Sequence, residues 1–172
     1  MYKKKLLKKC FEILGDKISC IMVMLLMISI SLTSCGTKTN DSIKIGTISP
    51  NTGVMAVYGE AVTNAYKLAI EEINSDGGVL NKPLELIIRD DQMVSGECIN
   101  AFNSLAAEGV EFIIGSVSSG CTSAICEMAN EEEIVLITPT STADSITTED
   151  DYVFRACFSD SFQGKIAAAF AK

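Results

Sequence analysis

The segment Glu111–Thr142, EFIIGSVSSGCTSAICEMANEEEIVLITPTST, decides the fold of this chain. It predicts a strand over Glu111–Gly115, a helix over Cys121–Glu131 and a second strand over Ile134–Thr138. Each strand holds a short, unbroken apolar run (FII and VLI), which is typical of strands buried on both faces of a parallel sheet. Because a right-handed crossover joins them, both strands should end at the same edge of one sheet.

Hydroxyl-bearing side chains follow both predicted strands. Ser118 and Ser119 come after the first strand, and Thr140, Ser141 and Thr142 come after the second. The serines lie where the helix should begin, and a helix N-terminus offers free N–H groups and the positive end of the helix dipole. Open α/β sheets bind ligands outside the carboxyl ends of their strands. We therefore expect a site for a small carboxylate here, although the serines could equally serve as helix caps.

The rest of the chain continues the alternation of strands and helices. Strands are predicted over Ile43–Ile48, Leu84–Arg89 and Tyr152–Ala156, and helices over Tyr58–Asn74, Gly96–Glu108 and from about Ser161 onward. This order predicts a three-layer α/β/α domain built on an open parallel sheet.

Helical periodicity predicts which side chains face the core. In the helix over Tyr58–Asn74, Leu68 and Ile73 fall on the apolar face, whereas Thr63 falls on the polar face. In the next helix, Cys98 and Phe102 are expected to point inward.

The first 34 residues are typical of a secretory signal. A lysine-rich start precedes the apolar run Ile18–Ile30, and Leu32–Cys35 resembles a bacterial lipobox, in which the cysteine is lipidated after cleavage. The polar segment Gly36–Ser42 suits a tether between membrane and domain. The alternative is that the apolar run itself anchors the chain, although it is short for a bilayer span.

Charge and residue types exclude several classes of function. Residues 35–172 hold 8 basic and 20 acidic side chains, a net charge of −12, which disfavours a nucleic-acid partner. The chain has no histidine, and no lysine lies between Lys82 and Lys165 to activate a serine, so catalysis is not expected. Asp90 and Asp91 after the second strand are best interpreted as a solvated turn. No cofactor is predicted.

Four cysteines follow Cys35, namely Cys98, Cys121, Cys126 and Cys157. An exported protein can form disulfides, and four cysteines allow three complete pairings between which the sequence does not choose. Buried free thiols fit the apolar positions of the first two equally well. Without histidine or a Cys-x-x-Cys motif, no metal site is predicted.

Several motifs, taken in chain order, resemble the first lobe of branched-chain amino acid (leucine/isoleucine/valine) ABC transporter substrate-binding proteins of the type I periplasmic-binding superfamily. They are Ile45-Gly46, Ser49–Gly59, Ala69–Gly78 (AIEEINSDGG), Asp90-Asp91, Ile113–Gly120, Ile137–Ala143 (ITPTSTA) and Tyr152–Gly164. The similarity runs from about Ile43 to the last residue.

The resemblance implies roles for individual residues. Ser119 and Thr142 match positions that hold the ligand's α-carboxylate, and the backbone carbonyl of Thr140 matches one that accepts from the α-ammonium. Tyr58 matches an aromatic residue of the side-chain pocket. The implied partners are an amino acid and ABC permease subunits. The implied function is extracytoplasmic binding of amino acids; the alternative is a ligand-sensing domain of a surface receptor for amides or small amphiphiles.

The resemblance also implies a domain order. Residues 1–34 would be the lipoprotein signal peptide, 35–42 the tether, 43–157 the first ligand-binding lobe and 158–172 the start of a second lobe. The family closes two lobes over its ligand, and this sequence is expected to stop in the first helix of the second lobe. That helix carries an apolar stripe, including Ile166 and Phe170, with no later strand to cover.

The lipobox yields the first prediction. Replacing Cys35→Ala removes the sulfur that accepts the lipid, so the protein should accumulate unprocessed or be released into the medium. Mass spectrometry and membrane fractionation measure both outcomes. If the variant stays in the membrane with the unmodified mass of the wild type, the apolar segment is itself the anchor.

Overall fold

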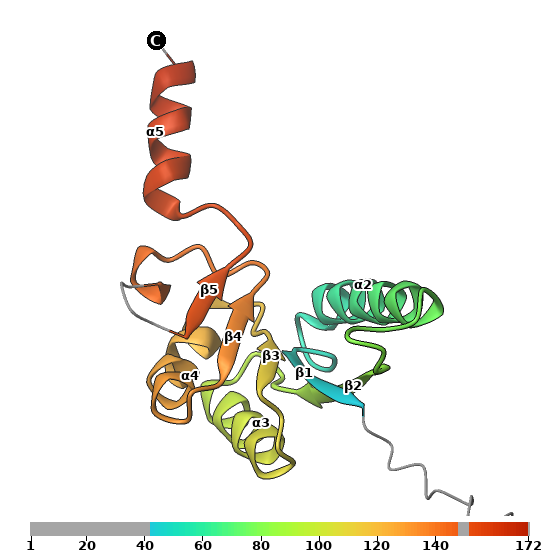
Figure 1. Ribbon diagram of the computed structural model, residues 1–172. Helices are drawn as coiled ribbons and strands as arrows, with labels where there is room; N and C mark the ends of the chain where they lie inside the picture. The colour runs from blue at the N-terminus through green and yellow to red at the C-terminus, as the bar shows by residue number, and fades with distance from the viewer. Residues whose placement is uncertain (1–41, 148–151, 172) are drawn as a thin grey trace, which may run out of the picture. The chain divides into compact units, whose positions relative to one another are not determined.

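The computed structural model describes residues 42–147 and 152–171, so the predicted signal, Cys35 and nearly all of the tether lie outside the described residues. The sheet has five parallel strands in the order β2-β1-β3-β4-β5 (Figure 1). The strands are β1 (Ile43–Ser49), β2 (Leu84–Asp90), β3 (Phe112–Ile114), β4 (Val135–Thr138) and β5 (Val153–Arg155). The helices are α2 (Ala56–Ser75), α3 (Ser95–Ala107), α4 (Ser119–Glu131), η1 (Asp144–Ile146) and α5 (Asp160–Phe170).

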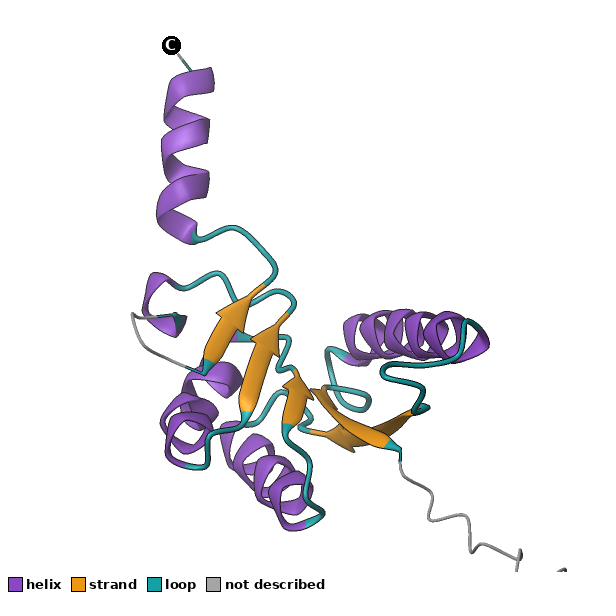
Figure 2. Cartoon of the chain, in the orientation of Figure 1, coloured by secondary structure: helices purple, strands orange, loops and turns teal. Residues whose placement is uncertain are grey.

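The α/β fold with a parallel sheet is confirmed, as Figure 2 shows. Each expected element is present, with ends that differ by at most two residues from the predicted ones. The short 3-10 helix η1 was not expected, because three residues carry no periodicity that a sequence pattern can reveal.

The buried core lies between the sheet and helices α3 and α4. Strand register aligns Ile113 with Leu136 and Leu136 with Val153, and all three side chains are buried. Phe102 of α3 and Ile125 of α4 belong to the same core cluster. This face of the sheet is therefore closed by apolar packing, which is the dominant favourable term in folding.

The opposite face is covered only in part. Helix α2 packs on β1 and β2 and lies on the other side of the sheet from α3 and α4 (Figure 1). Phe112, Ile137 and Phe154 point to this side and are 42%, 38% and 51% exposed. The expectation that β3 and β4 are buried on both faces is thus wrong for the described chain, because no described helix covers them there.

Helix α2 is rotated about its axis relative to the orientation that its apolar periodicity predicts. Thr63, expected on the polar face, is buried, donates to Asn51 Oδ1 at 2.9 Å and shares a 2.9 Å hydrogen bond with Ser49 Oγ. Leu68 and Ile73, both expected inside, are exposed. The cause is a close approach near the start of the helix, where a Cβ on Gly59 would lie 2.0 Å from the carbonyl oxygen of Pro50. Backbone contact and hydroxyl hydrogen bonds, rather than the apolar arc, therefore set the rotation of α2.

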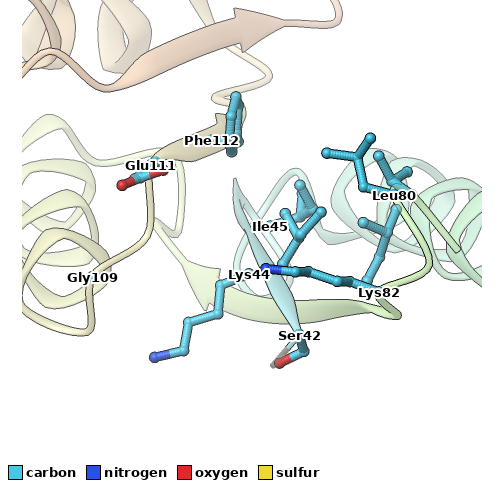
Figure 3. A pocket seen from close by; sticks show the side chains of 11 residues that line it. Ser42, Lys44, Ile45, Leu80, Lys82, Gly109, Glu111 and Phe112 are labelled. Atoms are coloured by element: carbon cyan, nitrogen blue, oxygen red, sulfur yellow. The ribbon is translucent and has the colours of Figure 1, made fainter. Parts of the chain in front are cut away.

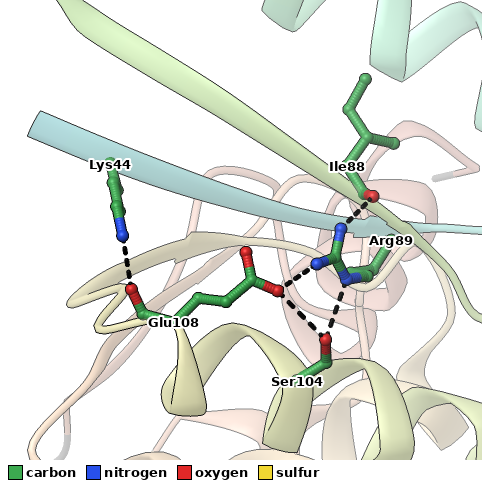
Figure 4. A network of polar contacts seen from close by, with 5 residues as sticks. All are labelled: Lys44, Ile88, Arg89, Ser104 and Glu108. Atoms are coloured by element: carbon green, nitrogen blue, oxygen red, sulfur yellow. Dashed lines mark hydrogen bonds and ion pairs between the residues drawn. The ribbon is translucent and has the colours of Figure 1, made fainter. Parts of the chain in front are cut away.

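A polar network joins the end of α3 to the two strands beside it (Figure 4). Arg89 on β2 donates to Ser104 Oγ at 3.1 Å and pairs with the Glu108 carboxylate. Lys44 on β1 donates to the backbone oxygen of Glu108 at 2.6 Å. Cations beside the last carbonyl groups of a helix are favourable because they oppose the negative end of its dipole.

Helix α5 exposes every residue that the structure describes in it, which agrees with the expectation that nothing covers its apolar stripe. Among the described helices, none combines the length and the apolar character needed to cross a membrane.

The packing of α2 leads to a test with an internal control. Replacing Gly59→Ala forces a Cβ into the Pro50 carbonyl and should lower the free energy of unfolding by about 1–3 kcal/mol, as overpacking does. A Cβ added to Gly96 on α3 would meet open space, so Gly96→Ala should leave stability unchanged or raise it by up to about 1 kcal/mol. Urea denaturation followed by circular dichroism compares the two. Equal stability of both variants would contradict the proposed packing of α2.

Candidate functional site

The loops after β3 and β4 lie next to each other because these strands are neighbours in the sheet. Helix α4 begins directly after the first of these loops. Ser118 has the extended backbone of an N-cap residue, and its Oγ accepts from the N–H of Cys121 at 3.2 Å. The capping role that the sequence left open is thus present, and it fixes where the helix N-terminus points.

A buried group of hydroxyl side chains joins the two loops. Ser141 Oγ lies 2.7 Å from Thr122 Oγ1 on α4 and 2.8 Å from Thr138 Oγ1 at the end of β4. Thr138 Oγ1 also donates to the backbone oxygen of Ser116, at 2.8 Å. All four residues are fully buried. The hydroxyl of Ser141 is therefore occupied inside the protein, where it holds the loops together.

Two further hydrogen bonds link the loops nearer the surface. The N–H of Ala143 donates to Ser119 Oγ at 3.3 Å, and Thr140 Oγ1 donates to the backbone oxygen of Val117 at 2.6 Å. The structure thus brings together all five hydroxyl residues that the sequence placed at this edge.

Several polar groups at this edge have no partner among the described residues. They are the backbone N–H groups of Ser119 and Gly120, the hydroxyl of Thr142 and the backbone oxygen of Thr140. The Ser119 hydroxyl accepts from Ala143 and keeps its own hydrogen to donate. Three of these donors, the two N–H groups and the Ser119 hydroxyl, lie at the N-terminus of α4, and Thr142 directly precedes Ala143, which bonds to Ser119. An ionised carboxylate, which only accepts hydrogen bonds, is the chemical match for such a set.

Tyr58 stands apart from this group. It lies in the first turn of α2, which follows β1, and its side chain is 61% exposed. Its side chain has no hydrogen bond with the described residues. Its predicted contact with a ligand stays a prediction.

The structure gives Asp90 a role that the sequence missed. Its Oδ1 accepts from the backbone N–H of Asn51 at 2.8 Å and of Gln92 at 3.0 Å, and its Oδ2 accepts from the Thr52 hydroxyl. Partial burial raises the pKa of Asp90, but these hydrogen bonds outweigh it and hold the pKa below its ordinary value. Through these hydrogen bonds Asp90 stabilises the loop between β1 and α2 at the carboxyl edge, in addition to lying in the turn after β2.

A cavity of about 670 Å³ lies elsewhere, at the amino ends of β1, β2 and β3 (Figure 3). Its walls include Ile45, Leu80 and Phe112, and it contains none of the predicted site residues. Lys44 and Lys82 also line it, but crossover helices turn their C-terminal, negative ends toward this edge, which disfavours a carboxylate. We therefore place the candidate site by its gathered donors and not by cavity size.

Comparison with known families identifies the class of protein. The family model described as periplasmic binding protein matches residues 42–172. The chain belongs to this family.

Individual relatives narrow the comparison. The chain is 34% identical over 129 residues to the Leu/Ile/Val-binding protein BraC3 of Rhizobium johnstonii, covering 74% of this chain and 35% of that protein. It is 35% identical over 131 residues to the leucine-, isoleucine-, valine-, threonine- and alanine-binding protein of Pseudomonas aeruginosa, covering 76% and 35% of the two chains. These names describe binding and not catalysis, which agrees with the prediction that the chain is not an enzyme.

Solved structures give the same result for the fold. The branched-chain amino acid transporter substrate binding protein LivJ from Streptococcus pneumoniae, in complex with isoleucine, superposes with a TM-score of 0.71 at 34% identity, over 76% of this chain and 38% of that one. The type I periplasmic-binding fold of the first lobe is thereby confirmed. This chain spans about 35% of the length of the curated relatives it matches.

The hydrogen-bonded Asp90 carboxylate predicts a pH dependence. Its pKa is lower in the folded protein than in the unfolded chain, so the stability it contributes is present above the unfolded value and is lost as pH falls through the folded value. Asp90→Asn should therefore lower the free energy of unfolding at pH 7 by about 0.5 kcal/mol or less, because the group is mostly solvated. The difference from wild type should shrink as pH falls below about 3.9, the ordinary pKa of aspartate. A difference that is the same at pH 7 and pH 3 in denaturant titrations would rule out this assignment.

Proposed function

We propose that this chain supplies the first ligand-binding lobe of an extracytoplasmic, lipid-anchored solute-binding component of an ABC importer for amino acids, with branched-chain amino acids as the preferred ligands. The observation that carries the proposal is the set of unpaired donors at the N-terminus of α4, between the loops after β3 and β4. Family membership and the names of the relatives support the ligand class.

Within this proposal, the ligand carboxylate accepts from the N–H groups of Ser119 and Gly120 and from the hydroxyls of Ser119 and Thr142. The helix dipole adds a favourable field at the same point. The Thr140 carbonyl is an acceptor and suits the α-ammonium, which only donates. The same edge thus offers both donors and an acceptor to a zwitterion.

Ser118 and Ser141 have supporting roles in this proposal. Ser118 caps α4, and Ser141 links that helix to the end of β4, so both act on the ligand through the geometry of the loops. Tyr58 would contribute apolar wall beside the ligand's side chain.

The remaining assignments follow from the sequence. Residues 1–34 would be removed, Cys35 would carry the lipid, residues 35–42 would form the tether, residues 43–157 the first lobe and residues 158–172 the beginning of a second lobe. Permease subunits of the importer would be the protein partners.

A single lobe leaves half of the ligand in water, where hydrogen bonds and charge pairs contribute far less than in a closed cleft.

The test uses a chimera in which this chain continues into the corresponding remainder of the Pseudomonas aeruginosa relative. Calorimetry should detect leucine and isoleucine binding, and Ser119→Ala and Thr142→Val should each weaken it by about 1.5–3 kcal/mol, the range for hydrogen bonds to charged groups. The Thr142→Val change keeps the shape of the side chain and removes only the donor.

Ser123→Ala is the matched control, because Ser123 is exposed on the same helix and has no hydrogen bond with the described residues. It should leave the affinity unchanged. Full affinity in both the Ser119 and the Thr142 variants would overturn the carboxylate site, and the absence of any amino-acid binding by the chimera would overturn the proposed ligand class.

A further inference from the structure

Three side chains that the proposed ligand site does not use meet beneath the carboxyl edge. Asp91 directly follows β2, Cys98 lies in the first half of α3, and Cys121 lies in the first turn of α4. The two sulfur atoms and a carboxylate oxygen of Asp91 all lie within 4.8 Å of one another. Cys98 and Asp91 are 0% exposed and Cys121 is 1% exposed, so the cluster is closed to solvent.

The carboxylate in this cluster has no cation beside it. Asp91 accepts from the N–H of Met93 at 3.0 Å and from the hydroxyl of Ser116. Within residues 42–147 and 152–171, no lysine or arginine forms an ion pair with it; the nearby Arg89 is paired with Glu108. Buried carboxylates are usually paired with a cation or bound to a metal, because burial of an isolated charge is costly.

The two thiols are only weakly engaged. Cys98 Sγ donates to the backbone oxygen of Cys121 at 3.4 Å, and Cys121 Sγ lies beside it in the cluster. The sulfurs of Cys126 and Cys157 likewise donate to backbone carbonyl groups, at 3.2 Å to Thr122 and 3.4 Å to Ser141. Among the described cysteines, however, only Cys98 and Cys121 share a cluster with a carboxylate.

From this arrangement we propose that Asp91, Cys98 and Cys121 form a structural binding site for a thiophilic divalent cation, of which Zn²⁺ is the best match. Zinc binds cysteine sulfur at about 2.3 Å and carboxylate oxygen at about 2.0–2.2 Å in tetrahedral geometry. Two sulfurs on one tetrahedral zinc lie about 3.8 Å apart, and the observed sulfurs lie within 4.8 Å of each other. A disulfide would need the same sulfurs to approach to about 2.05 Å, and it would leave the carboxylate without a cation.

The Ser116 hydroxyl supports the carboxylate of this cluster. It donates to Asp91 Oδ2 and thereby orients the carboxylate, as groups around metal ligands commonly do. A water molecule would fill the fourth position, as in zinc sites with three protein ligands. Binding would release one proton from each thiol to solvent, giving two thiolates, one carboxylate and the dication. The ion would join the loop after β2 to the N-terminus of α4, and so it would help to fix the helix end that carries the free donors.

Sequence patterns contain no sign of this site, because the chain lacks histidine and the two cysteines are separated by 22 residues without a zinc-finger spacing. Only the packing of α3 beside α4 on one face of the sheet brings the two together.

The experiment uses the full chain, reduced, loaded with Zn²⁺ and freed of excess metal by gel filtration with a weak chelator. Elemental analysis should find about one more Zn²⁺ per chain in the wild type than in Cys98→Ser or Cys121→Ser. Asp91→Asn should weaken binding about tenfold or more, since it removes an anionic ligand. The double variant Cys126→Ser/Cys157→Ser is the matched control and should retain the ion. Metal bound by Cys10, Cys20 or Cys35 is present in all samples and therefore does not change the difference between them.

Cobalt provides a readout on the wild-type chain itself, so it does not depend on how well the variants fold. Co²⁺ added to the wild-type chain should give thiolate-to-metal charge-transfer absorption and the intense visible bands of a tetrahedral site, and a wild-type spectrum without them overturns the proposal. Equal metal content in the wild type and the two cysteine variants overturns the proposal. So does a mass two hydrogens lower for the Cys98–Cys121 peptides of protein purified without reductant, which would mean that these cysteines form a disulfide.

Discussion

The hydrogen bonds among the buried hydroxyls of Thr122, Thr138 and Ser141 are the interaction on which the rest of the site depends. These three side chains come from a helix, the end of a strand and the loop after it, and they meet within 2.7–2.8 Å. A buried hydroxyl that loses its partner costs about 1–3 kcal/mol, so the network permits few alternative arrangements of these segments. It thereby sets the position of the α4 N-terminus relative to Thr142 without using any of the donors that face outward.

The two faces of the sheet differ in how completely helices cover them. On one side α3 and α4 close an apolar core; on the other, α2 covers β1 and β2, while side chains such as Phe112, Ile137 and Phe154 stay exposed. Thr47 Oγ1 and the Tyr66 hydroxyl lie buried on the α2 side without a hydrogen-bond partner among the described residues, and burial raises the pKa of Tyr66 to about 12. Stability therefore comes mainly from the α3–α4 side.

Periodicity and turn residues were sufficient to predict the parallel sheet and the edge at which Ser119 and Thr142 meet. They did not predict the rotation of α2. That rotation depends on the close contact of Gly59 with the Pro50 carbonyl and on the hydrogen bonds of Thr63, and an apolar pattern records neither. They also treated Asp90 and Asp91 as a solvated turn, which is wrong for Asp91, because its side chain is fully buried. For Asp90 they missed the hydrogen bonds from a loop 38 residues earlier in the chain, which are invisible in sequence. The cluster of Asp91, Cys98 and Cys121 was missed for the same reason: its members are distant in sequence and adjacent only in the fold.

The proposed function depends on the donors at the N-terminus of α4, which should bind the carboxylate of an amino acid. A crystal structure of the chimera with isoleucine is the decisive experiment. We expect carboxylate oxygens within hydrogen-bonding distance of the Ser119 and Gly120 N–H groups and of the Thr142 hydroxyl. Isoleucine bound with its carboxylate away from these groups, for example in the cavity lined by Ile45 and Phe112, would refute the proposed site.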